Sequence, residues 1–213
     1  MKTINNSSKK TGIIFALFIL LAIGLTTSCK KSTCNYSPCT VRDSINVSTG
    51  LDSIGKANIA GGIDYNWEVI SSPYLPLTTA KTTLPFPGFW QPTPIVGTNA
   101  TWINCSGTTS ANLAGNYIFE RSFTIAPGTI SFTCDFGVIC DDILGPVQII
   151  SPPVTVATTV PVVPTTTYYL SNNIGTVFTN PTPGVWKIRA TVKFVDNVGG
   201  FLTSGFIKTL KPC

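Results

Sequence analysis

Apolar and polar residues alternate with a period of two in four stretches of the chain. Such a period places successive side chains on opposite faces of a strand, so each stretch predicts a half-buried β-strand. In the last stretch, apolar side chains from Trp186 to Phe194 point one way and basic or hydroxyl side chains point the other way. The four predicted strands cover residues 63–69, 117–125, 131–140 and 186–194.

Shorter apolar runs bounded by turn residues predict further strands at 147–150, 154–158, 168–171, 176–179 and 205–210. No helical period follows residue 30. About nine to ten strands with one apolar face each must pack as two sheets, so we expect an all-β fold, an antiparallel β-sandwich of the jelly-roll kind over residues 57–213. The proline-rich stretch 71–98 carries several aromatic residues, which predicts an ordered excursion packed on the sandwich.

The N-terminus has the pattern of a secretory signal peptide over residues 1–28. A lysine-containing start precedes an apolar run from Ile13 to Leu25, and small residues lead to Cys29. This ending, with Cys29 followed by two lysines, resembles the lipoprotein signals of Bacteroidetes, in which the cysteine is lipidated. An uncleaved membrane anchor and an ordinary disulfide cysteine are the alternatives. Residues 29–56 are polar and predict a flexible tether.

Composition and charge narrow the classes of function. The chain has 43% hydrophobic and 11% charged residues, which is unlike a disordered protein. Histidine is absent, which excludes catalytic and metal sites that depend on imidazole. Without the lysines of the signal segment, 11 basic residues face nine acidic ones. No basic patch indicates nucleic-acid binding, and nothing in the sequence implies a cofactor or a metal.

A series of motifs resembles a jelly-roll domain that recurs in secreted and surface-anchored bacterial proteins. It starts with Asp64-Tyr65-Asn66-Trp67-Glu68-Val69 and continues with Phe89-Trp90 and Thr101-Trp102-Ile103. It ends with Gly115-Asn116-Tyr117-Ile118-Phe119-Glu120-Arg121-Ser122-Phe123. The resemblance covers about residues 60–210. It implies a non-catalytic, galactose-binding-like sandwich in a surface protein.

Six cysteines remain if Cys29 is lipidated, and an even number in an exported chain predicts disulfides. Cys134 and Cys140 lie six residues apart on one strand, about 20 Å, and should not bridge each other unless the chain turns at Gly137. Cys34 and Cys39 flank a turn and can close on each other. Cys105 and Cys213 then pair with Cys134 and Cys140 in an order that stays open, and we expect Cys213 to be tied to the body of the domain.

Tryptophans, charged residues and one arginine are the candidates for chemistry. Trp67 and Trp186 lie on apolar strand faces and predict core positions, whereas Trp90 and Trp102 lie in loop-like sequence, either packed there or exposed to stack on a sugar. Asp64 and Glu68 are about 13 Å apart along one predicted strand, which is too far for a catalytic pair of carboxyl groups. We expect both side chains to be solvated.

Arg121 shares the apolar face of its strand, so it needs an acceptor such as Asp135, or a bulge that turns it outward. Asp141-Asp142 reads as an acidic turn, with calcium binding as the alternative. We expect no catalytic residue. The expected function is a lipid-anchored, non-catalytic module of the bacterial envelope that binds glycan or protein, with a structural surface or fimbrial subunit and an enzyme as alternatives.

Overall fold

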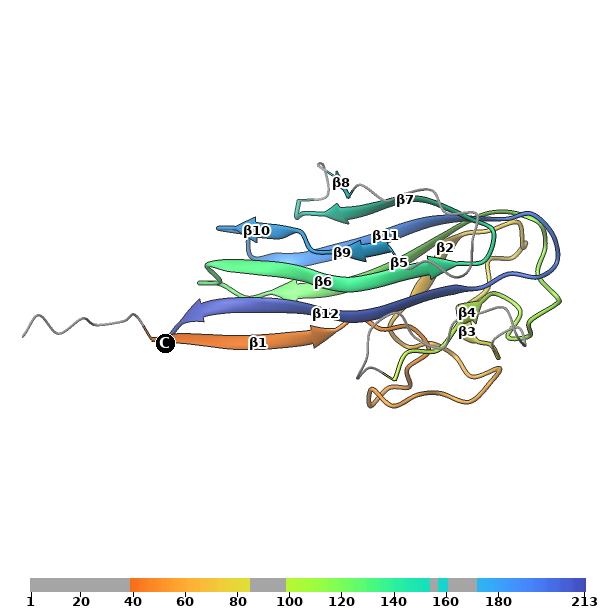
Figure 1. The fold of residues 1–213 in the computed structure, drawn as a ribbon, viewed down its shortest axis with the longest axis horizontal. Helices are drawn as coiled ribbons and strands as arrows, with labels where there is room; N and C mark the ends of the chain where they lie inside the picture. The colour runs from red at the N-terminus through yellow and green to blue at the C-terminus, as the bar shows by residue number, and fades with distance from the viewer. Residues whose placement is uncertain (1–38, 85–98, 154–156, 161–171) are drawn as a thin grey trace, which may run out of the picture. The chain divides into compact units, whose positions relative to one another are not determined.

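The computed structural model describes residues 39–84, 99–153, 157–160 and 172–213, and within them every regular element is a β-strand (Figure 1). This confirms the all-β prediction, with twelve strands in place of nine or ten. No helix in the described ranges is long and apolar enough to cross a membrane. The strands are β1 (Thr40–Asn46), β2 (Glu68–Ser71), β3 (Lys81–Thr82), β4 (Ile103–Asn104), β5 (Gly115–Ile125), β6 (Ser131–Cys140), β7 (Ile143–Ile150), β8 (Ala157–Val160), β9 (Asn172–Ile174), β10 (Val177–Thr179), β11 (Gly184–Phe194) and β12 (Phe201–Pro212).

The strands form two antiparallel sheets. The seven-stranded sheet has the order β10-β6-β12-β4-β3, with β1 also paired to β12 and β9 to β6, and the five-stranded sheet has the order β2-β5-β11-β7-β8. Without the short strands β2, β3 and β4, and with β9 and β10 sharing one position, the orders are β1-β12-β6-β9/β10 and β5-β11-β7-β8. Two four-stranded sheets with the first and last strands as neighbours form a jelly roll.

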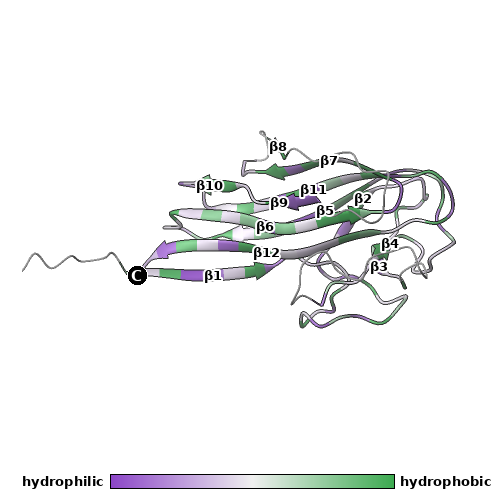
Figure 2. Cartoon of the chain, in the orientation of Figure 1, coloured by the Kyte–Doolittle hydropathy of each residue, from purple (hydrophilic) through white to green (hydrophobic). Residues whose placement is uncertain are grey.

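The core lies between the sheets because each long strand has one apolar face. Figure 2 shows hydrophobic and hydrophilic residues alternating along β6 and β12. The aromatic rings of Phe119 and Phe201, one from each sheet, stack with centroids 4.9 Å apart. At the other end of the core, Phe132 meets the ring of Trp186 edge-on at 4.9 Å. Trp67 and Trp186 are both buried, as the sequence predicts.

The strands expected from long alternation are present. The predicted stretches 117–125, 131–140 and 186–194 coincide with β5, β6 and β11. Of the shorter predictions, 147–150 lies in β7, 176–179 overlaps β10 and 205–210 lies in β12. The stretch 168–171 and residues 154–156 lie outside the described residues.

The predicted strand 63–69 is wrong over most of its length, since only Glu68 and Val69 belong to a strand. The preceding segment turns because the Asp64 carboxylate accepts hydrogen bonds from the backbone N–H groups of Asn66 and Trp67, at 2.7 and 3.0 Å. This turn buries Asp64 and leaves Tyr65 65% exposed, the reverse of the predicted faces.

The predicted tether is also wrong for residues 39–56. Residues Thr40–Asn46 form β1, which pairs with Phe206–Pro212 of β12, and Val47 to Leu51 are buried. β1 is an edge strand with five of its seven residues exposed, so its sequence lacks the apolar alternation of a central strand. The folded domain therefore includes residues 39–56, which precede its predicted start at residue 57.

β12 is the inner strand of the seven-stranded sheet. It pairs with β6 over ten consecutive positions on one side, and with β1 and β4 on the other (Figure 1). The segment 207–210 is therefore paired on both sides and is not free to add to the sheet of another subunit.

The start of the proline-rich excursion packs on the sandwich as expected. The Tyr74 hydroxyl donates a hydrogen bond to the Ala111 carbonyl at 2.7 Å, and its ring lies edge-on to Tyr117. Residues 85–98, including Phe86, Phe89 and Trp90, lie outside the described part of the chain.

Candidate binding surface

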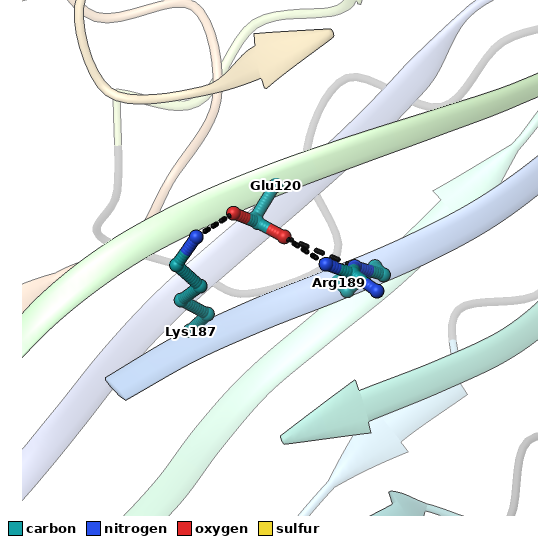
Figure 3. A network of polar contacts seen from close by, with 3 residues as sticks. All are labelled: Glu120, Lys187 and Arg189. Atoms are coloured by element: carbon teal, nitrogen blue, oxygen red, sulfur yellow. Dashed lines mark hydrogen bonds and ion pairs between the residues drawn. The ribbon is translucent and has the colours of Figure 1, made fainter. Parts of the chain in front are cut away.

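An ion-paired cluster lies on the outer face of the five-stranded sheet. In Figure 3 the Glu120 carboxylate of β5 lies between the side chains of Lys187 and Arg189, both on β11. Lys187 Nζ is 2.5 Å from Oε1, and Arg189 donates from Nε and Nη2 to Oε2 at 3.0 and 2.7 Å. The cluster forms because Arg189 is the direct cross-strand partner of Glu120 and Lys187 is two residues away on the same face.

The two cations decide the ionisation of Glu120. Burial alone would raise the pKa of this carboxyl, which is only 4% exposed. The hydrogen bonds and positive charges of Lys187 and Arg189 outweigh burial and hold its pKa below the ordinary value. Glu120 is therefore a fixed anion, and the cluster as a whole keeps one positive charge.

Glu68 lies beside this cluster, as the cross-strand partner of Glu120 on β2. Sequence spacing directed attention to Asp64 and Glu68, so it missed this pair, which only the strand register reveals. Glycoside hydrolysis uses two nearby carboxyl groups, one of them an acid with a raised pKa. The pKa of Glu120 is shifted in the opposite direction, so Glu120 lacks the electrostatics of such an acid.

Asp64 and Arg121 organise the opposite, inner side of β5. Asp64 was expected to be solvated, but it is 4% exposed and accepts a third backbone hydrogen bond from Gly50 at 2.6 Å. Burial raises the pKa of Asp64, while these hydrogen bonds and the charge of Arg121 lower it. Arg121 lies on the predicted inner face and donates to the carbonyls of Asn66 and Asn46, at 3.2 and 3.4 Å. Its acceptors are backbone carbonyls, not Asp135.

Trp102 is a core residue and not a platform for a sugar. It is 1% exposed and packs in a small cluster with Ala100, Ile139 and Leu202. Trp90 lies outside the described residues, so that candidate stays a prediction. The exposed aromatic in the described chain is instead Tyr65, which the predicted strand had assigned to the core.

The disulfide in the structure joins Cys39 to Cys213, with Cα atoms 5.3 Å apart. The expectation that Cys213 is tied to the body is confirmed. The pairing of Cys39 with Cys34 is wrong, because β1 carries Cys39 to the end of β12, and Cys34 and Cys29 lie outside the described residues. Cys105, Cys134 and Cys140 are buried free thiols. The predicted pairing of Cys105 and Cys213 with Cys134 and Cys140 is therefore also wrong.

The acidic pair Asp141-Asp142 forms the turn between β6 and β7, as the expectation of an acidic turn has it. Asp142 adopts a left-handed backbone conformation with φ of 67°, and its carboxylate accepts a hydrogen bond from the Val195 N–H at 2.7 Å. Burial, with a smaller contribution from the nearby negative charge of Asp196, raises the pKa of Asp142. Within the described ranges, no group of three or more acidic or cysteine side chains is placed to hold a metal ion.

A depression of about 460 Å³ lies over the seven-stranded sheet, where β1 begins and β12 ends. Its volume is within the range of small-ligand sites. Two rows of cross-strand partners line it, each running over β1, β12 and β6: Arg42, Leu210 and Ser131 in one row, and Ser44, Lys208 and Thr133 in the other. Asp43 and Thr209, which lie between the rows, complete the lining. Sequence analysis missed this surface because three of its eight lining residues come from the unrecognised strand β1.

Comparison of the sequence with protein-family models gave no match, and neither did comparison with curated proteins.

Proposed function

We propose that this chain is a non-catalytic module of a bacterial cell envelope, anchored by a lipid on Cys29, that binds a glycan or a protein at the cell surface. The single observation that favours binding is the open, polar depression formed by β1, β6 and β12. It offers cationic and hydroxyl side chains from three strands whose register fixes their spacing. Rigid strands hold such groups in place at little entropic cost on binding.

The sequence and the chain ends support the anchoring part of the proposal. Cys29 follows the apolar run and precedes the folded domain by ten residues, a distance of at most about 35 Å when fully extended. The domain starts and ends at one place, where the Cys39–Cys213 bridge joins β1 to β12. An anchor at Cys29 therefore joins the described domain at Cys39, beside this bridge.

The electrostatics of Glu120 support a non-catalytic role. Its lowered pKa and its two cationic partners make it a structural anion on the outer sheet face. A binding module needs such a fixed surface, whereas a glycosidase needs a carboxyl group that exchanges protons near neutral pH.

The anchoring test is the substitution Cys29→Ser, with Cys34→Ser as the matched control. We expect Cys29→Ser to move the protein from the membrane fraction to the soluble fraction or to block its processing, and Cys34→Ser to leave it membrane-bound. Intact-mass analysis of the wild type should show an acylated Cys29. An unmodified N-terminus at another residue contradicts the lipoprotein assignment.

The binding test is a glycan array probed with the full chain in detergent, together with size-exclusion chromatography. Binding without turnover of the bound glycan is expected. Release of product from any array glycan contradicts the non-catalytic assignment, and self-assembly into polymers without ligand favours a structural subunit instead.

A further inference from the structure

The depression over β1, β6 and β12 has an excess of positive charge that the described protein does not neutralise. Arg42 is exposed and forms neither an ion pair nor a side-chain hydrogen bond with any described residue. Lys208 forms an ion pair with Asp135. Asp43, which also lines the depression, forms an ion pair with Lys211. Counting both ion pairs, two anions face three cations, and the charge of Arg42 leaves a net charge of about one unit.

Strand register places the two cations close enough to share a ligand group. Arg42 is the cross-strand partner of Leu210, and Lys208 lies two residues before Leu210 on the same face. Such diagonal neighbours have Cα atoms about 7–8 Å apart, so their long side chains can both reach one ligand group above the sheet. The Asp43 carboxylate pairs instead with Lys211, at 3.4 Å between Oδ2 and Nζ. Along their strands, Asp43 and Lys211 alternate with Arg42 and Lys208, so Asp43 does not compete with a ligand for these two cations.

The ion pair between Lys208 and Asp135 is easily exchanged. The two side chains are 57% and 49% exposed, and exposed ion pairs contribute about 0–1 kcal/mol. An anionic ligand can thus replace Asp135 as the partner of Lys208 at little cost. The existing pair also shows that the Lys208 ammonium already holds an oxyanion in this geometry.

Hydroxyl groups and one apolar side chain complete the surface. Ser44, Ser131 and Thr133 present hydroxyls that both donate and accept hydrogen bonds. The half-buried Leu210 lies between Arg42 and Ser131 in one of the two rows. A sugar ring has the complementary surface, with hydroxyls at its rim and an apolar face of C–H groups. An acidic peptide supplies the charge but not the ring of hydroxyls.

We infer that this depression binds an acidic saccharide, a sugar that carries a carboxylate or a sulfate, with Arg42 and Lys208 on the anionic group and the three hydroxyls around the ring. The inference rests on the proposed function as a binding module and names the ligand class of the same surface. A neutral glycan leaves the charge of Arg42 unmatched.

The test measures binding of the full chain in detergent to two acidic probes, oligogalacturonate and dextran sulfate, with dextran as the neutral probe. We expect binding of at least one acidic probe, little binding of dextran, and weakening as NaCl rises from 0.05 to 0.5 M because exposed charges are screened. Arg42→Gln and Lys208→Gln should each weaken acidic-probe binding about three- to tenfold. Lys56→Gln, the same charge change at an exposed turn, is the matched control and should have no effect.

The substitution Asp135→Asn should change the affinity for the acidic probe in the opposite direction. It removes the competing carboxylate from Lys208, so we expect tighter binding of the acidic probe, which a merely structural role of the pair does not produce. The inference is overturned if neither acidic probe binds, if Arg42→Gln and Lys208→Gln match Lys56→Gln, or if poly-aspartate binds as well as the acidic saccharides. If a neutral array glycan binds all these variants equally, the inference of an acidic ligand is overturned but the proposed binding function is not. If no ligand binds at all, both the inference and the proposed function are overturned.

Discussion

The bond between Cys39 and Cys213 should account for a large share of the stability of this domain. It closes a loop with a sequence separation of 174 residues. In the chain-entropy description, closing a loop of that length lowers the entropy of the unfolded chain by about 17–18 cal/mol/K, or about 5 kcal/mol at 25 °C. Without the bond, the start of β1 also gains freedom in the folded state, because five of its seven residues are exposed. The expected loss of stability is therefore about 2–4 kcal/mol.

The double substitution of Cys39 and Cys213 by serine tests this value without leaving an unpaired thiol. For a domain of this size, each kcal/mol lowers Tm by about 2–4 °C, so we expect a fall of about 5–15 °C by circular dichroism. Wild type in reducing buffer should match the double variant. The variant should also unfold with a larger denaturant slope, since its unfolded chain is less compact.

Equal melting temperatures for the double variant and oxidised wild type would refute this reasoning. Peptide mapping without reduction provides an independent check of connectivity. A bridge from Cys39 to Cys34 in the folded protein contradicts the pairing of β1 with the end of β12.

Four further predictions concern the core and the charged sites. Glu120→Gln should lower stability by about 1–2 kcal/mol near neutral pH. Because the folded-state pKa of Glu120 is lowered, its contribution is present above the ordinary pKa near 4.3 and is lost as pH falls through the folded value, so the variant should show a flatter acid unfolding curve. Arg121→Ala should lower Tm by removing two hydrogen-bond donors to part-buried carbonyls, and an unchanged Tm contradicts its structural role. Trp102→Ala should cost about 3–5 kcal/mol in chemical denaturation, whereas a sugar platform would lose only binding. Burial raises the pKa of Cys105 to about 11 and that of Cys134 to about 12, so both should resist a thiol reagent at pH 8 until the chain unfolds.

The sequence predicts strands well where one face is buried along the whole strand. β5, β6 and β11 have this property, and their alternation is imposed by the core. β1 carries no such signal, because an edge strand with exposed faces tolerates polar residues at every position. The same failure explains the missed disulfide and the missed depression, since both depend on β1 lying beside β12.

Asp64 illustrates a second limit of sequence patterns. Its position in an alternating stretch predicted a solvated face, but three backbone N–H groups form a site for a buried carboxylate there. Alternation reports which side chains avoid water and not which backbone groups need a partner. Glu120 was likewise placed correctly on an outer face, while its burial depends on two cations contributed by another strand.

The inner position of β12 has a consequence for the order of folding. The strand β12, Phe201–Pro212, pairs with each of β1, β4 and β6. Contacts between distant parts of a chain form slowly, because the intervening loop must first close. A chain still emerging from the ribosome lacks β12 and cannot complete the seven-stranded sheet. The seven-stranded sheet of such a polypeptide stays open until β12 has been synthesised, so this segment sets the moment at which the sheet can close.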